Sequence, residues 1–341
     1  MDREPTIGEW RKLFQAAQSF YELAPWEWVF DFDIFGIQNP ETKEVGYASI
    51  LGNLGEVFGL CVYLGSEGLT NYLRLQGRDP EEIDWDVVVG LRCLTAFFED
   101  REDLDPRDRD VIKKLGLKFR GRKAWPVFRS HRPGYAPWYL TSSEARFLTV
   151  ALLQAQHVAK RLLDDPELLD RAPDDLYLVR VRTGKRWRDE WQPPPPPPPL
   201  VFEPLPEEVV SALRAQNRPR NGVWEVDLFL LPTMIQERKD SPPYYVSALL
   251  CVHQESYFVV GIDLVPYWNR LTQLQRRFAK VLEKSPIGWP KRVLVKRLEL
   301  LVLLSPLLED LGIEIELAPR LPALEEVQQS FIAFLTKRAL S

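Results

Sequence analysis

Cysteine is scarce in this 341-residue sequence, which contains only Cys61, Cys93 and Cys251, far apart from one another. An odd number of widely spaced cysteines argues against the disulfide framework that holds small secreted domains together. Each of the three stands in an apolar run, where free cysteines are usually buried. We therefore expect reduced, inert thiols and a cytoplasmic protein.

Long apolar runs are missing as well. The first ten residues, MDREPTIGEW, carry acids and no apolar core, so we expect no signal peptide. The most apolar stretch, residues 298–317, is interrupted by Glu299, Ser305, Pro306, Glu309 and Asp310. A membrane span needs about 20 predominantly apolar residues, so the sequence predicts no membrane association.

Signatures of metal binding and of common catalytic sites are also absent from the sequence. The three histidines, His131, His157 and His253, stand alone, without the paired His or Cys spacing of tetrahedral zinc sites. There is no G-x-S-x-G nucleophile elbow, and GNLGE lacks the spacing of a phosphate-binding loop. We therefore expect no resident metal or cofactor, and we favour a non-catalytic protein over an enzyme.

The sequence does contain a mixed charge and one long proline run. Lys and Arg number 44 against 49 Asp and Glu, so the net charge of −5 predicts no general affinity for nucleic acid, and any basic surface must be local. Seven consecutive prolines, residues 193–199, must form an extended polyproline II spacer of about 22 Å. They predict an N-terminal domain (1–190), a polyproline linker (191–200) and a C-terminal domain (201–341). A ligand for a proline-recognition domain is the alternative role of this run.

The N-terminal domain mixes helical and strand-like patterns, which predict an α+β fold with an antiparallel sheet. Apolar residues recur at every second position in the strands and at i, i+3 and i+4 in the helices. Ser66 and Asp105 stand where helix N-caps are expected, and Thr141 with Glu144 has the spacing of a capping box. The expected helices are residues 6–23, 66–76, 105–116 and 141–165, and the expected strands are residues 26–38, 45–52, 56–65 and 86–100, with two more around 183–187.

The C-terminal domain has a sharper pattern. Three strand-like segments come first, and helices then alternate with short strands up to a final helix over 321–340. This order, βββαβαβα, is the topology of the ribonuclease H-like fold, in which crossover helices cover the sheet. The complete prediction is therefore an α+β chain whose second domain resembles a ribonuclease H-like fold.

A nuclease of that fold needs several carboxylates that converge on two metal ions about 3.5–4 Å apart. Asp227 is well placed in the first strand of the domain, and Asp263 in the third strand is a second candidate. Lys296 and Arg297 occupy the end of the fourth strand, where another carboxylate is needed, and Glu299 comes slightly late. The set is incomplete, so a degenerate or unusual metal-dependent nuclease is the alternative function.

One window, residues 111–143, contains eight Lys or Arg residues and no acid. Within it, residues 115–140 interleave cations with aromatic rings. The cations suit contacts with phosphates, and the rings suit stacking on unpaired bases, which contributes about 1–3 kcal/mol per base. The candidate binding residues are Lys118, Arg120, Arg122, Lys123, Trp125, Arg129, Arg132, Tyr135 and Trp138.

The same segment also has a structural interpretation. Residues 117–123 alternate, with Lys118, Arg120 and Arg122 on one side, as in an edge strand whose cations face water. The rings that follow then form a proline-fixed loop packed against the next helix, and acids from Glu99–Asp105 pair with the cations. A surface for a protein partner is the third interpretation.

Three stretches resemble a bacterial two-domain family with no assigned activity: WEWVFDFDIFGIQNPETKEVGYASILG, LGLKFRGRKAWPVFRSHRPGYAPWYL and, in the second domain, WPKRVLVKRLELLVLLSPLLEDLG. The resemblance implies a prokaryotic, cytoplasmic protein of two parts, and it supplies no catalytic residues. From the residues themselves we predict a non-catalytic binding or interaction module. Its basic aromatic surface lies at 115–140, and its partner is nucleic acid, another anion or a protein.

Overall fold

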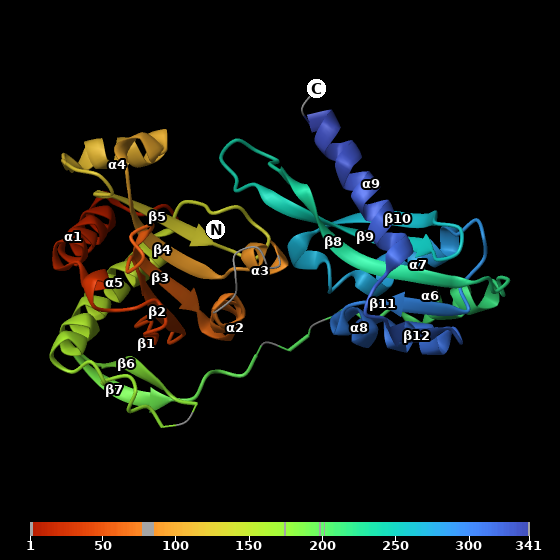
Figure 1. Ribbon diagram of the computed structural model, residues 1–341, viewed down its shortest axis with the longest axis horizontal. Helices are drawn as coiled ribbons and strands as arrows, with labels where there is room; N and C mark the ends of the chain where they lie inside the picture. Colours follow the sequence, from red (N-terminus) through yellow and green to blue (C-terminus); the bar gives the residue numbers. More distant parts are fainter. Residues whose placement is uncertain (1–2, 77–84, 174, 198, 201, 340–341) are drawn as a thin grey trace. The chain divides into compact units, whose positions relative to one another are not determined.

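A computed structural model describes residues 3–76, 85–173, 175–197, 199–200 and 202–339 (Figure 1). Pro198 of the predicted linker, Val201 at the predicted start of the second domain and Leu340 of the predicted last helix lie outside these ranges. The chain divides into two compact units, Met1–Pro198 and Pro199–Ser341. No helix in the described ranges combines the length and the apolarity that a membrane span requires.

The first unit is built on a seven-stranded sheet in the order β5-β4-β3-β2-β1-β6-β7. Neighbouring strands are antiparallel except β1 and β6, which are parallel. The sheet is therefore mixed, whereas the sequence predicts a wholly antiparallel one. The reason is the long connection through helix α5, which follows edge strand β5 and returns the chain beside β1. The strands are β1 (Phe35–Gln38), β2 (Val45–Leu51), β3 (Phe58–Leu64), β4 (Cys93–Glu99), β5 (Trp125–His131), β6 (Tyr177–Thr183) and β7 (Arg186–Gln192).

Helices cover both faces of this sheet. On one face, side chains of α1 and α5 share a core with Ile50 and Leu60 of the central strands. On the other face, α2 places Tyr72 against Tyr63. Burial on both faces explains why β2 and β3 are apolar at nearly every position. The helices of this unit are α1 (Ile7–Leu23), α2 (Gly65–Leu75), α3 (Trp85–Val89), α4 (Pro106–Leu115) and α5 (Ser142–Asp164).

The predicted strand over 26–38 is wrong for most of its length. Residues Pro25–Glu27 form a single 3-10 turn, and strand β1 begins only at Phe35. Between them, the Phe30 N–H donates to Asp33 Oδ2 (2.8 Å) and the Asp33 N–H donates to the Phe30 carbonyl (3.1 Å), which closes a turn. A local side-chain bond to the backbone therefore overrides the apolar alternation in this segment.

The second unit has a five-stranded sheet in the order β10-β9-β8-β11-β12. Strands β8 to β10 are antiparallel, whereas β8, β11 and β12 are parallel. From Val223 onward the elements follow the predicted order, but helix α6 precedes them and was not expected. They are α6 (Glu207–Ala215), β8 (Val223–Ile235), β9 (Tyr244–His253), β10 (Phe258–Pro266), α7 (Leu274–Lys284), β11 (Arg292–Val295), α8 (Leu298–Asp310), β12 (Glu314–Leu317) and α9 (Pro322–Ala339).

The two faces of this sheet have separate cores. Leu228 and Leu249 point toward α7 and α8. The next residues along the same strands, Phe229 and Leu250, point toward α9. This alternation fixes the face on which each polar residue of β8 and β10 lies.

Candidate anion-binding site

The segment 115–140 does not begin as an edge strand. Helix α4 ends at Leu115 and is capped by Gly116, whose φ of +69° suits the left-handed turn that closes the helix. Residues 117–124 are irregular, and the edge strand β5 starts at Trp125. Leu117 and Phe119 nevertheless turn inward against the core, and the Phe119 ring stacks on Phe14 with centroids 6.0 Å apart. The predicted alternation of exposure is therefore present without the predicted strand.

The outward-facing cations of this irregular stretch follow one another at every second position in the sequence. Lys118, Arg120 and Arg122 are exposed and make no ion pair within the described ranges. Lys113 and Lys114, in the last turn of α4, are also exposed and lack an ion pair there. We call these five residues the cationic strip.

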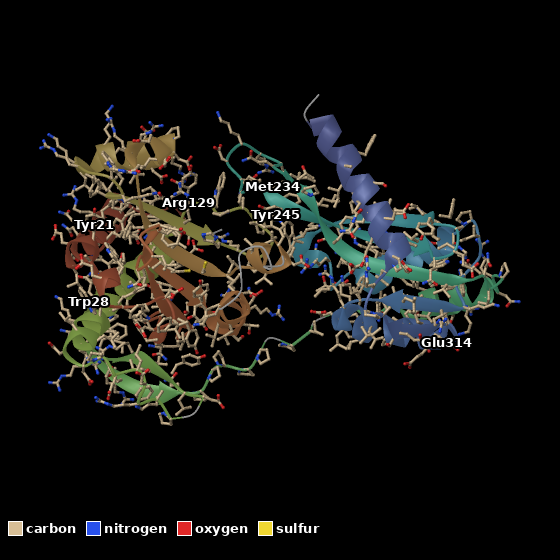
Figure 2. The ribbon with its side chains drawn as sticks, in the orientation of Figure 1. Tyr21, Trp28, Arg129, Met234, Tyr245 and Glu314 are labelled. Atoms are coloured by element: carbon tan, nitrogen blue, oxygen red, sulfur yellow. The ribbon has the colours of Figure 1, made fainter. Side chains whose placement is uncertain are left out.

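The remaining candidate cations are held in ion pairs. Lys123 Nζ lies 2.7 Å from Glu99 Oε2, and this bond raises the pKa of Lys123. Arg129, labelled in Figure 2, binds Asp108 (2.6 Å) and Asp105 (2.8 Å). Burial alone would lower the pKa of Arg129, but the two aspartates outweigh it and raise the pKa.

Arg132 completes the set, because its Nη2 lies 3.4 Å from Glu144 Oε1. Acids distant in sequence thus balance the C-terminal half of the acid-free window. They leave the N-terminal half, which carries the cationic strip, without such partners.

The aromatic rings of the segment are engaged in packing. Trp125 meets the edge of Phe119 (centroids 5.7 Å apart) and lies under the Arg101 guanidinium (5.8 Å). Tyr139 is covered by the guanidinium of Arg107 at 4.1 Å. Tyr135 and Trp138 are half-buried, and none of the six rings between 115 and 140 is exposed. The segment therefore offers charge to a ligand, but no row of free stacking faces.

The outer edge of β5 is closed by the loop that follows it. Ser130 and Trp138 exchange backbone hydrogen bonds of 2.7 and 2.9 Å across this edge. Backbone groups alternate sides along a strand, so Phe128 and Pro126 share the outer edge with Ser130. Pro126 has no N–H to offer a further strand.

The structure does not bring together the carboxylates proposed for a nuclease. Asp227 pairs in register with Leu250, whereas Asp263 pairs with Leu249. Paired residues share a face and successive residues alternate, so the two aspartates point to opposite faces of the sheet.

Each aspartate also has a cation beside it. Arg297 Nε lies 3.3 Å from Asp227 Oδ1, and Arg277 Nη1 lies 2.9 Å from Asp263 Oδ2. Glu299 lies in the first turn of α8. Within the described part of the chain, no group of three His, Cys, Asp or Glu residues is arranged to hold a metal.

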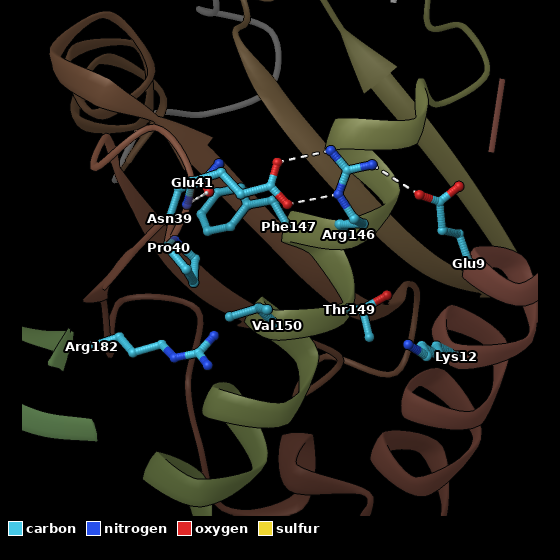
Figure 3. A pocket seen from close by; sticks show the side chains of 10 residues that line it. All are labelled: Glu9, Lys12, Asn39, Pro40, Glu41, Arg146, Phe147, Thr149, Val150 and Arg182. Atoms are coloured by element: carbon cyan, nitrogen blue, oxygen red, sulfur yellow. Dashed lines mark hydrogen bonds and ion pairs between the residues drawn. The ribbon is translucent and has the colours of Figure 1, made fainter. Parts of the chain in front are cut away.

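A pocket that the sequence interpretation missed lies on α5, with a volume of about 280 Å³ (Figure 3). Its walls come from α1, the turn after β1, α5 and β6, so residues spread over most of the first unit meet there. Because the set spans such distant segments, no local sequence pattern marks it. The lining residues of this α5 pocket are Glu9, Lys12, Asn39, Pro40, Glu41, Arg146, Phe147, Thr149, Val150 and Arg182.

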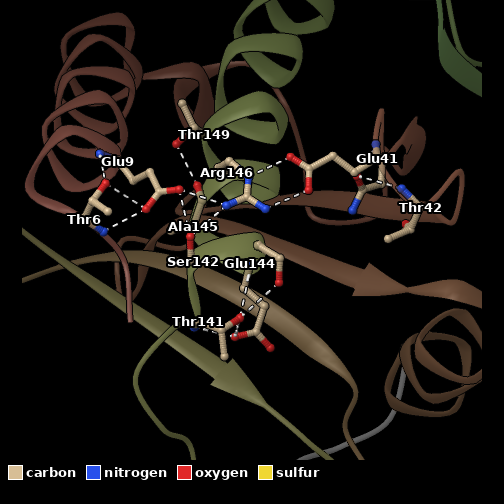
Figure 4. A network of polar contacts seen from close by, with 12 residues as sticks. Thr6, Glu9, Glu41, Thr42, Thr141, Ser142, Glu144, Ala145, Arg146 and Thr149 are labelled. Carbon is tan, nitrogen blue, oxygen red and sulfur yellow. Dashed lines mark hydrogen bonds and ion pairs between the residues drawn. The ribbon is translucent and has the colours of Figure 1, made fainter. Parts of the chain in front are cut away.

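Arg146 connects three walls of the α5 pocket (Figure 4). Its Nε and Nη2 bind the two carboxylate oxygens of Glu41 at 2.6 and 2.8 Å, and its Nη1 binds Glu9 Oε1 at 2.8 Å. Ser142 Oγ also donates to Glu9 Oε1 (2.7 Å). Burial alone would raise the pKa of Glu9, but hydrogen bonds from Thr6, Ser142 and Arg146 lower it to about 2.

Two other cations of the α5 pocket have no acid against them. Neither Lys12 nor Arg182 makes an ion pair in the described residues, and the guanidinium of Arg182 donates from Nε to the Gly184 carbonyl (3.0 Å). Figure 3 shows the two side chains reaching from opposite sides toward Thr149 and Val150. The pocket therefore has an unbalanced positive charge on each side.

Comparison with protein families gives two matches. Residues 10–180 match the family model described as "Domain of unknown function (DUF7309)". Residues 210–332 match a second, described as "Domain of unknown function (DUF6930)". A comparison with curated proteins gives no significant match.

Proposed function

The chain belongs to the DUF7309 family, and because that description assigns no activity, we propose from the geometry that it is a non-catalytic module that binds the phosphate backbone of nucleic acid. The observation that carries this proposal is the cationic strip. Its five side chains are exposed and have no ion pair in the described ranges, although the whole chain has a net charge of −5. A local excess of Lys and Arg is the electrostatic signature of a phosphate-binding surface.

The packing of the aromatic rings favours contacts with phosphates over stacking on bases. Phosphate contacts position a protein on nucleic acid without reading its sequence, whereas stacking and base-edge contacts need accessible side chains. Because Trp125, Tyr135 and Trp138 are half-buried, we expect salt-sensitive binding with little preference for sequence.

The test measures binding of a labelled duplex by fluorescence anisotropy over a series of salt concentrations. Replacing two cations, Arg120→Glu with Arg122→Glu, should weaken binding and reduce the slope of log affinity against log salt by about two, since each phosphate contact contributes about 0.9. The control is Lys160→Glu with Lys185→Glu, which makes the same charge change at two exposed lysines elsewhere in the first unit.

The two variants separate a surface effect from a net-charge effect. Equal weakening in both, or wild-type affinity in the Arg120/Arg122 variant, refutes the cationic strip as the site. A wild-type protein that does not bind nucleic acid at low salt refutes the function itself and leaves a protein partner as the remaining interpretation.

For the second unit we propose a ribonuclease H-like arrangement that has lost metal-dependent cleavage. The strand order β10-β9-β8-β11-β12, with only its first three strands antiparallel, supports the fold. The pairing of Asp227 with Arg297, and the opposite orientation of Asp263, support the loss of cleavage. We expect no cleavage of an oligonucleotide with Mg²⁺ or Mn²⁺. Cleavage that Asp227→Asn abolishes would restore the nuclease interpretation.

A further inference from the structure

We propose that the α5 pocket binds a small organic dianion, a dicarboxylate whose two acidic groups flank a short apolar body. This site lies in the same unit as the cationic strip but shares no residue with it, so the two proposals stand independently.

The charge distribution of the α5 pocket points to two acidic groups. The carboxylates of Glu9 and Glu41 are balanced by Arg146 and by Arg3, whose Nη2 lies 3.6 Å from Glu9 Oε1, so these four side chains together add no net charge. Lys12 and Arg182 remain, one on each side of the pocket (Figure 3). A ligand with a carboxylate at each end can meet both cations, whereas a monoanion leaves one of them without a partner.

The surface between the two cations suits an apolar body. Val150, Phe147 and Pro40 supply carbon surface, and the hydroxyl of Thr149 donates its proton to the Ala145 carbonyl (2.7 Å), so it offers no donor to a ligand. Small-molecule sites commonly combine an apolar lining with a few placed polar groups. A volume of about 280 Å³ is large enough for a small metabolite.

The walls of the pocket are fixed before a ligand arrives. Arg146 ties α1 to α5 through Glu9 and ties α5 to the turn after β1 through Glu41. A site that is already ordered loses less conformational freedom on binding than a mobile one. Arg146 is therefore a positioning residue for this site, and Lys12 and Arg182 are its ligand contacts.

The experiment titrates the full chain with succinate, glutarate and terephthalate by isothermal calorimetry, with benzoate as the matched monoanion. We expect at least one dicarboxylate to bind saturably and more tightly than benzoate. Lys12→Met and Arg182→Met, which keep an apolar stem, should each weaken that dicarboxylate by about tenfold or more, because a charge-assisted hydrogen bond is lost. Lys160→Met, an exposed lysine on α5 outside the pocket, should leave the affinity unchanged.

Three results overturn the proposal: no saturable binding of any dicarboxylate, equal affinity for benzoate, or wild-type affinity in both pocket variants. Both substituted side chains are solvent-accessible, so the variants should keep the wild-type thermal midpoint, and the titrations then report on the site itself. The Arg120→Glu/Arg122→Glu variant should bind the dicarboxylate normally. Failure of nucleic-acid binding is thereby distinguished from failure of this site.

Discussion

His131, at the end of β5, is a half-buried imidazole near the cation Arg129. Burial and the charge of Arg129 lower its pKa to about 4, against an ordinary value of 6.5. The imidazole is therefore neutral in the folded protein at pH 5, whereas in the unfolded chain it is largely protonated.

This difference predicts a pH dependence of stability. The contribution of His131 is fully present above pH 6.5 and is lost as the pH falls toward 4, because the unfolded state binds the proton more tightly. We expect a loss on the order of 2 kcal/mol in the free energy of unfolding over this window. Urea titrations at pH 7 and pH 5 should show it in wild type and show less of it in His131→Gln.

His157 provides the matched control for this measurement. It is an exposed imidazole on α5, and partial desolvation together with Arg180 and Arg161 lowers its pKa. His157→Gln should keep most of the wild-type pH dependence. The carboxylate of Glu9, with its pKa of about 2, loses its contribution only below its ordinary value of 4.5, so it does not interfere between pH 7 and pH 5.

At the scale of single elements, the start of helix α9 depends on a strand residue. Glu225 on β8 is fully buried; its Oε2 accepts the Leu324 N–H (2.8 Å) and its Oε1 accepts the Gln254 side-chain amide (3.1 Å). A carboxylate at a helix N-terminus satisfies a backbone donor and interacts favourably with the helix dipole.

We therefore expect Glu225→Ala to destabilise the second unit by about 1–3 kcal/mol, since it leaves buried donors without partners. Hydrogen exchange should show the largest loss of protection in the first turns of α9. Glu314→Ala, at an exposed glutamate on β12 (labelled in Figure 2), is the control and should have little effect. Equal protection of α9 in both variants would contradict the capping role.

The sequence predicts well those elements for which local side-chain chemistry and tertiary packing favour the same structure. The capping box of Thr141 and Glu144 is present at the start of α5, and β2 and β3 pair as the expected hairpin. The interpretation fails where a local contact competes with the pattern. The side chain of Asp33 accepts the Phe30 N–H and stabilises a turn where a strand was predicted. Ser66, the predicted N-cap, lies inside α2 and does not cap it.

The candidate sites are harder to predict from the sequence than the helices and strands are. The cations of 115–140 are visible in the sequence, but their partners are not, because Asp108 on α4 and Glu144 on α5 reach Arg129 and Arg132 only in the folded unit. The α5 pocket gathers residues between Glu9 and Arg182, and no spacing rule connects them. Tertiary contacts, which a sequence pattern does not encode, decide which charges remain available.

At the scale of the whole molecule, the boundary between the two compact units falls within the proline run of the sequence. Strand β7 continues to Gln192, two residues into the predicted linker, and the backbone of Glu203 already bonds to Thr272 of the second unit. Each unit has its own sheet and its own buried core.

We therefore expect residues 1–198 and 199–341, expressed separately, to fold on their own. Each should unfold cooperatively in urea with the midpoint that it has in the full chain. The measurement is circular dichroism of the two pieces and of the intact protein. A piece that is unfolded, or whose midpoint falls well below that in the full chain, would show that one unit stabilises the other.

The closed outer edge of β5 bears on how the protein behaves when crowded. An open edge invites a strand from a neighbouring molecule, which is a route to aggregation. Here Pro126 and the Ser130–Trp138 bridge interrupt that edge, and the opposite edge strand, β7, carries charged side chains at Arg186, Arg188 and Glu190. The first unit should therefore remain dispersed at high concentration, with fibril growth blocked at both ends of its sheet by two different means.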